Sequence, residues 1–144
     1  MNKINVNGKE VVLDLDALAF DEVNLSEWLN KAGASYAYYS SMLAIAENEY
    51  EVKFNAKFIE YKDQGGTDKL AESRAKVDED VAQARLNYKL LQQYVRAWDK
   101  AHSAAQSRSY YLRQEMNKLN FGMPFNKPDD DSIEDMIKAI KNND

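Results

Sequence analysis

The longest regular pattern in the chain is a repeat of apolar and small residues between positions 68 and 120. One set of these residues recurs every seven positions. A second set lies between them, four residues after one member of the first set and three residues before the next. Neither glycine nor proline interrupts the stretch between Gly66 and Gly122. This heptad pattern predicts one long helix, or two nearly collinear helices, burying a narrow seam against partner helices. The central seam positions are Val81, Ala84, Tyr88, Leu91, Val95, Trp98, His102, Ala105, Ser109, Leu112 and Met116.

A second helical stripe precedes the heptad repeat. From Ser35 to Asp63, apolar and aromatic residues follow one another at steps of three and four, which predicts a helix and not a strand. Gly65 and Gly66 then end the pattern, because glycine adopts the left-handed backbone conformation that closes a helix. Thr67 can cap the next helix. The two patterns together predict an antiparallel helical hairpin.

The N-terminal residues carry a different signal. Asn7 and Gly8 lie between short alternating apolar runs, and both tolerate the positive φ of a two-residue turn, so a small β-hairpin is predicted. Asp14 or Asp16 can cap a following helix through about Leu29, in which Leu18, Leu25 and Trp28 are candidate anchors. The predicted fold is therefore all-α with a helical hairpin, one long heptad-patterned helix and a small N-terminal β-hairpin.

The C-terminal end differs in composition from the rest. Pro124 and Pro128 bound a linker, and an acidic, amphipathic segment follows it. The sequence thus predicts a helical domain over residues 1–122 and a linker with an acidic tail over 123–144.

The predicted helix over 68–120 would be roughly 80 Å long at 1.5 Å per residue. The preceding helix is about half as long, so the rest of the seam needs a second subunit or a chain that folds back. His102, Ala105 and Ser109 are small or polar seam residues, and they make 101–109 the place for such a break. Homo-oligomerisation is the favoured solution. The predicted subunit interface comprises Leu91, Val95, Trp98, Leu112 and Met116.

Composition excludes several classes of protein. The 144 residues predict a single domain, and they include no cysteine and one histidine, which excludes a disulfide framework and a thiolate zinc site. The start lacks the apolar run of a signal peptide, and no stretch of about 18 apolar residues occurs. We expect a protein of the cytoplasm, away from membranes. The sequence lacks a phosphate loop and a nucleophile elbow, and His102 occupies a seam position, so neither an enzyme nor a cofactor is predicted.

Charge is distributed unevenly along a chain whose formal net charge is −5. Residues 61–122 hold 11 basic and 8 acidic side chains, whereas both flanking segments are acidic. On one long helix, a row of cations would project within about 80° of arc, opposite the seam. A second group flanks the turn at Gly65, where Tyr50 and Tyr61 could stack bases. The candidate DNA-binding residues are Lys53, Lys57, Lys62, Lys69, Arg74, Arg85, Lys89, Arg96 and Lys100. A solvated coiled-coil surface would show a similar pattern.

Several short motifs resemble the recombination mediators of tailed phages, the UvsY family. They are VVLDLDAL near the start, SEWLNK, NAKFIEYKDQGGTD, DEDV at 78–81 and SRSYYLR at 107–113. The resemblance implies a helical homo-oligomer, expected to form a ring, that binds single-stranded DNA. It further implies that the protein helps to load a recombinase in place of single-strand-binding protein. It places a DNA contact at Lys57 and gives Asp78, Asp80 and Val81 an architectural role.

The chain departs from this family in its net charge, its Asn7-Gly8 hairpin and its acidic tail. These features keep two alternatives open. One is a phage structural or assembly protein built on the same coiled coil, without DNA binding. The other is an acidic DNA mimic that inhibits a nucleic-acid-binding protein.

Overall fold

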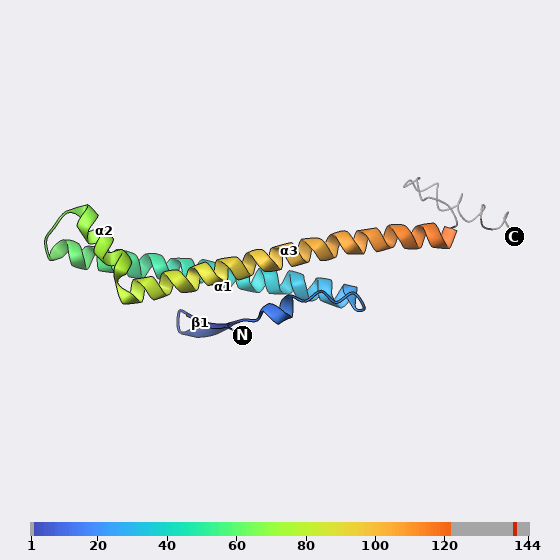
Figure 1. Cartoon of the computed structure of the whole chain (residues 1–144), viewed down its shortest axis with the longest axis horizontal. Coiled ribbons are helices and arrows are strands. Elements are labelled where there is room, and N and C mark those ends of the chain that lie inside the picture. Colours follow the sequence, from blue (N-terminus) through green and yellow to red (C-terminus); the bar gives the residue numbers. More distant parts are fainter. Residues whose placement is uncertain (1, 122–139, 141–144) are drawn as a thin grey trace. The chain divides into compact units, whose positions relative to one another are not determined.

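The computed structural model describes residues 2–121 and 140, and it confirms the predicted all-α fold with a small N-terminal hairpin (Figure 1). The elements are β1 (Asn2–Val6), β2 (Lys9–Leu13), the 3-10 helix η1 (Leu15–Leu18), α1 (Leu25–Asp63), α2 (Asp68–Val77) and α3 (Glu79–Phe121). Contacts divide the chain into two units, Met1–Ser103 and Ala104–Asp144, with the division inside α3. The predicted tail at 123–144 lies outside the described residues, apart from Ile140.

The hairpin forms as its turn chemistry predicts. Asn7 has φ 53° and Gly8 has φ 85°, and the strands pair antiparallel with Val6 opposite Lys9. Every second residue faces inward, which buries Ile4, Val6, Val11 and Leu13. An isolated two-stranded hairpin is marginally stable in water, so this buried face needs the helices beneath it.

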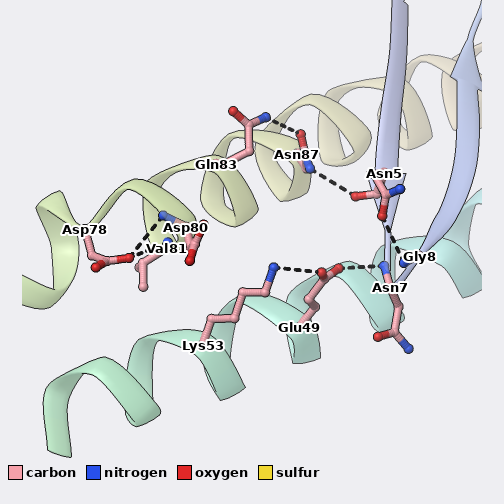
Figure 2. A network of polar contacts seen from close by, with 10 residues as sticks. All are labelled: Asn5, Asn7, Gly8, Glu49, Lys53, Asp78, Asp80, Val81, Gln83 and Asn87. Atoms are coloured by element: carbon pink, nitrogen blue, oxygen red, sulfur yellow. Dashed lines mark hydrogen bonds and ion pairs between the residues drawn. The ribbon is translucent and has the colours of Figure 1, made fainter. Parts of the chain in front are cut away.

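Polar contacts fix the hairpin turn to both long helices (Figure 2). The Asn7 backbone N–H donates to Glu49 Oε2 of α1 at 2.8 Å. Asn87 of α3 donates from Nδ2 to the Asn5 carbonyl at 3.0 Å. The turn therefore bridges α1 and α3, although most of its side chains are exposed.

Two tyrosines hold the other end of the hairpin. Tyr39 of α1 donates its hydroxyl hydrogen to the Val12 carbonyl at 3.2 Å, and Tyr94 of α3 donates to the Asp14 carbonyl at 3.0 Å. Their rings meet edge to face, with centroids 4.8 Å apart. Burial, reinforced by Tyr94, raises the pKa of Tyr39 to about 12, so its hydroxyl remains a donor at neutral pH.

The helix predicted from Asp14 or Asp16 through Leu29 is wrong. Asp14 caps only η1, where it accepts from the Asp16 N–H at 3.0 Å. Asp21 then accepts from the N–H groups of residues 23 and 24, at 3.1 and 3.0 Å. Aspartate side chains that bond nearby backbone groups compete with helix formation, and α1 consequently begins at Leu25.

Trp28, predicted as an anchor, is buried at the start of α1. Its Nε1 donates to the Ala19 carbonyl, and its ring lies 6.1 Å from that of Trp98. Further along, Tyr50 of α1 stacks on Tyr88 of α3. Trp28 thus meets a later residue of α3 than Tyr50 does. The order of contacts is reversed along the two helices, so they are antiparallel (Figure 1). This confirms the predicted helical hairpin.

The turn between α1 and α2 also follows its predicted chemistry. Gly65 and Gly66 have φ values of 95° and 122°, which L side chains rarely adopt. Thr67 Oγ1 accepts from the Leu70 N–H at 3.2 Å and so caps α2.

The prediction of one helix, or two nearly collinear helices, over 68–120 is wrong at Asp78. This residue has φ −60° and ψ 136°, an extended conformation that ends α2 (Figure 1). Its Oδ1 accepts from the N–H groups of Asp80 and Val81 at 3.0 and 3.4 Å, which caps α3 (Figure 2). The break predicted at 101–109 does not occur, because α3 is helical throughout those residues.

The predicted subunit interface needs correction in its first half. Leu91, Val95 and Trp98 are 0%, 7% and 1% exposed within a single chain, so they present no surface to a second subunit. The physical reason is that α1 of the same chain covers this part of the seam, since Tyr94 meets Tyr39 and Trp98 meets Trp28, a residue ahead of the predicted start of the helix at Ser35. Met116, in the second unit, is 59% exposed, and Leu112 is half-buried.

Candidate nucleic-acid interface

The three candidate lysines of α1 are each paired with a carboxylate. Lys53 lies 3.1 Å from Glu49, one turn earlier on α1, and Glu49 also holds the hairpin turn (Figure 2). Lys62 lies 2.6 Å from Asp68 and donates to the Gly66 carbonyl at 3.2 Å. These lysines therefore stabilise the ends of helices and turns of their own chain.

Lys57 has the most partners of the three. Its ammonium lies 3.2 Å from Glu60 and 3.7 Å from Asp78, the cap of α3. The hydrogen bond to Glu60, followed by attraction to Asp78, raises the pKa of Lys57. Burial acts to raise the pKa of Asp78, but the Val81 N–H and the Lys57 charge together lower it. Tyr61 donates to Asp78 Oδ2 at 3.3 Å, so this cluster ties the end of α1 to the break before α3.

Lys69 and Arg74 lie on α2, and both are exposed. The extended conformation of Asp78 separates them from α3, so Arg74 does not continue the row of cations that a single helix would carry. The predicted arc of DNA-binding residues is thereby reduced to its members on α3.

Four exposed cations remain on the first unit's part of α3. They are Arg85, Lys89, Arg96 and Lys100, called the α3 stripe from here on. Helical geometry places all four within about 60° of arc. None forms an ion pair with another described residue, and Lys89 lies 5.9 Å from the centre of the Tyr88 ring. Gln92, Gln93 and Ser103 fall on or beside the same arc, and Asp99 borders it.

The tyrosines proposed as base-stacking platforms are not available for that role. Tyr50 packs between Tyr88 and Phe54, with centroid distances of 6.3 Å to each. Tyr61 is half-buried and bonded to Asp78. The tyrosines that sequence reasoning left out are Tyr110 and Tyr111, which are 66% and 53% exposed. Their signal was their position between arginines in the segment SRSYYLR.

His102 packs against α1 at a close approach of the two helices. A Cβ added to Gly33 would lie 3.3 Å from His102 Nε2, so glycine makes room for the imidazole. Within residues 2–121 and 140, no group of three His, Cys, Asp or Glu side chains is arranged to hold a metal ion. Nor does that part of the chain contain a helix with the length and apolar character needed to span a bilayer.

Comparison of the chain with protein-family models, curated proteins and solved structures gives no match. The likeness to the UvsY family therefore rests on its short sequence motifs alone. What the described residues add is a distinction between cations that are paired within the chain and cations that are free to meet a ligand.

Proposed function

We propose that this chain binds single-stranded DNA through the α3 stripe and acts as a recombination mediator. The observation that supports this is the contrast in pairing: the stripe's four cations are exposed and have no ion pair within the described residues, whereas Lys53, Lys57 and Lys62 of α1 each lie beside a carboxylate. Cations in a row along one helix face can neutralise successive phosphates. Release of the condensed counterions then supplies much of the affinity.

The rest of the surface restrains this binding. With a net charge of −5, the chain as a whole repels a polyanion, so the local field of the stripe must prevail at short range. We therefore expect modest affinity per chain and strong weakening by salt. Several chains acting on one strand would raise the overall affinity without new contacts.

The role of mediator follows from such binding together with the UvsY-like motifs. Weak binding to the DNA backbone, independent of base sequence, suits a protein that stays on a strand while single-strand-binding protein dissociates and a recombinase binds. We include single-strand-binding protein and a recombinase as partners because the resemblance to the UvsY family implies them.

Fluorescence anisotropy with a labelled oligothymidylate, measured across a salt series, tests the proposal. The parent chain should bind with a falling log affinity against log salt. Replacing Arg85, Lys89, Arg96 and Lys100 with Gln should weaken binding at least tenfold at low salt and flatten the slope, while circular dichroism stays helical. A parent chain that shows no salt-dependent binding would contradict the proposal and favour the assembly protein or the DNA mimic.

A specific feature of α1 favours self-assembly, either alongside DNA binding or as the main function. Tyr38, Ile45, Val52 and Ile59 recur every seven residues and are 41–58% exposed. Helical geometry groups them with Ala, Ser and Asn residues into an arc of about 120° that contains no charged side chain between residues 34 and 59. This set, the α1 arc, has the heptad spacing of a coiled-coil seam.

We propose that the α1 arc packs against a second copy of the chain. Replacing Val52 and Ile59 with Lys should abolish any multimer seen by sedimentation, because each copy would place two charges in the contact. Val23→Lys is the matched control, since Val23 is 91% exposed in the loop before α1. A parent chain that stays monomeric at high concentration would overturn this second proposal and leave the first intact.

A further inference from the structure

Tyr110 and Tyr111 stand apart from the other tyrosines of the chain. They are 66% and 53% exposed, whereas the next most exposed of the nine tyrosines, Tyr38, is 43% exposed and lies beneath the Lys9 ammonium. Most of the others take part in the contacts between the hairpin, α1 and α3. More than half of the surface of each side chain is left in water, which makes this pair a candidate for contact with a ligand.

Cations accompany the two rings. The Arg108 guanidinium lies over the Tyr111 ring, 5.6 Å from its centroid. Arg113 is exposed on the next turn of the helix. The one acidic residue between 104 and 121 is Glu115, which lies 3.7 Å from Lys118. Along the sequence from 104 to 121, basic residues thus outnumber acidic ones by three to one.

Neutral hydrogen-bonding side chains complete the same side of the helix. Ser107 precedes Tyr110 by three residues, and Gln114 follows it by four, so both lie beside the rings. The apolar residues Leu112, Met116 and Leu119 fall on the opposite side by helical period. A ligand on the tyrosines would therefore leave that apolar side open to a protein partner.

We infer that Tyr110 and Tyr111 form a base-stacking site for single-stranded DNA in the second unit. The inference rests on the proposed function and goes further, because it adds recognition of bases to attraction for phosphates. Aromatic rings accept any base, since every base has a π face, and the exposed Arg113 can meet a phosphate beside the stacked bases. Recognition by stacking would tolerate every sequence, as a mediator requires.

The test compares two ligands that differ only in their bases. An oligothymidylate and an abasic strand of equal length carry the same number of phosphates, so electrostatic binding treats them alike. The parent chain should prefer the oligothymidylate by roughly tenfold or more, because each stacked base contributes measurably to affinity. Replacing Tyr110 and Tyr111 with Ala should remove that preference and leave the salt slope unchanged, since no phosphate contact is lost.

Two control variants separate stacking from other effects. Tyr110→Phe with Tyr111→Phe keeps both rings and should keep the preference. Tyr36→Ala removes a tyrosine of α1 that is 37% exposed and lies outside the α1 arc, and it should also keep the preference. Circular dichroism shows whether each variant remains helical.

Other results would overturn the proposed stacking site. A parent chain that binds both strands equally, or an alanine variant that retains the preference, overturns the stacking site while the proposed function stands. Loss of preference in the phenylalanine variant overturns it as well, because the hydroxyls would then carry the recognition. A parent chain that binds neither strand overturns both proposals.

Discussion

The chain carries two groups of cations that look alike in the sequence and differ in the structure. Lys53, Lys57 and Lys62 follow one another along α1, and each lies within 3.2 Å of a carboxylate. The α3 stripe has similar spacing but forms no ion pair among the described residues. A basic cluster can thus be paired within the fold or left exposed and unpaired, according to where its acidic neighbours lie.

The contrast between the two groups of cations depends on the packing of α1 against α3. A substitution in the core between these helices should therefore have the largest effect on stability. Leu91 is fully buried, so Leu91→Asp places an unpaired charge in the core and should cost roughly 4 kcal/mol or more of unfolding free energy. Urea denaturation followed by circular dichroism measures this. Leu86→Asp is the matched control on the same helix, since Leu86 is 51% exposed and its replacement should cost little. Equal losses in the two variants would contradict the assigned core.

A smaller effect is expected where the α1 lysines meet the cap of α3. Asp78→Ala removes the side-chain cap and a partner of Lys57, and should lower the melting temperature by several degrees. Asp78→Asn keeps an acceptor oxygen for the cap and should recover most of the loss. An alanine variant that melts like the parent would show that Asp78 does not hold this junction.

The lowered pKa of Asp78 predicts how the stability of the fold changes with pH. The pKa of Asp78 is lowered from 3.8 in the folded chain, so its contribution to stability is present above about pH 4. That contribution is lost as the pH falls below 3.8 and through the lower folded pKa. Melting curves in acid should therefore show a steeper loss of stability for the parent chain than for Asp78→Asn. Parallel losses would indicate that other carboxylates dominate acid unfolding.

The smallest effect on stability is expected at Gly33, where α1 lies close to His102 of α3. Gly33→Ala gains helix propensity of about 1 kcal/mol but places a Cβ 3.3 Å from His102 Nε2. The two effects should nearly cancel in the parent chain. In a His102→Ala background the gain should emerge, and a double-mutant cycle measures it. Identical effects in both backgrounds would mean that His102 does not require the glycine.

Local chemistry made much of the fold predictable. The turns at Gly8 and Gly65 need positive φ, and the period of the apolar residues identified the long helices. The break at Asp78 was missed because the heptad pattern continues across it, with Val77 and Val81 both in seam positions. An aspartate cap overrode that pattern, and Val77 is left 79% exposed. The start of α1 was missed because Gly33 lowers helix propensity within the first turns.

The candidate site was harder to predict for a different reason. The pair formed by Lys53 and Glu49 is visible as an i, i+4 spacing, but Lys57 and Asp78 meet only through the folded chain. Which cations remain free is therefore a tertiary property. The same holds for tyrosines, since Tyr50 and Tyr110 differ in burial for reasons that no local spacing reveals.

The most direct test of the account removes equal charge from the two groups and compares the salt dependence of DNA binding. One variant replaces Arg85, Lys89 and Arg96 with Gln, and the other replaces Lys53, Lys57 and Lys62 with Gln. Each lost phosphate contact lowers the slope of log affinity against log salt by roughly 0.7 for single strands, so the α3 variant should lose about 2. The α1 variant should keep the parent slope. Equal flattening in both variants, or flattening in the α1 variant alone, would contradict the distinction between paired and free cations.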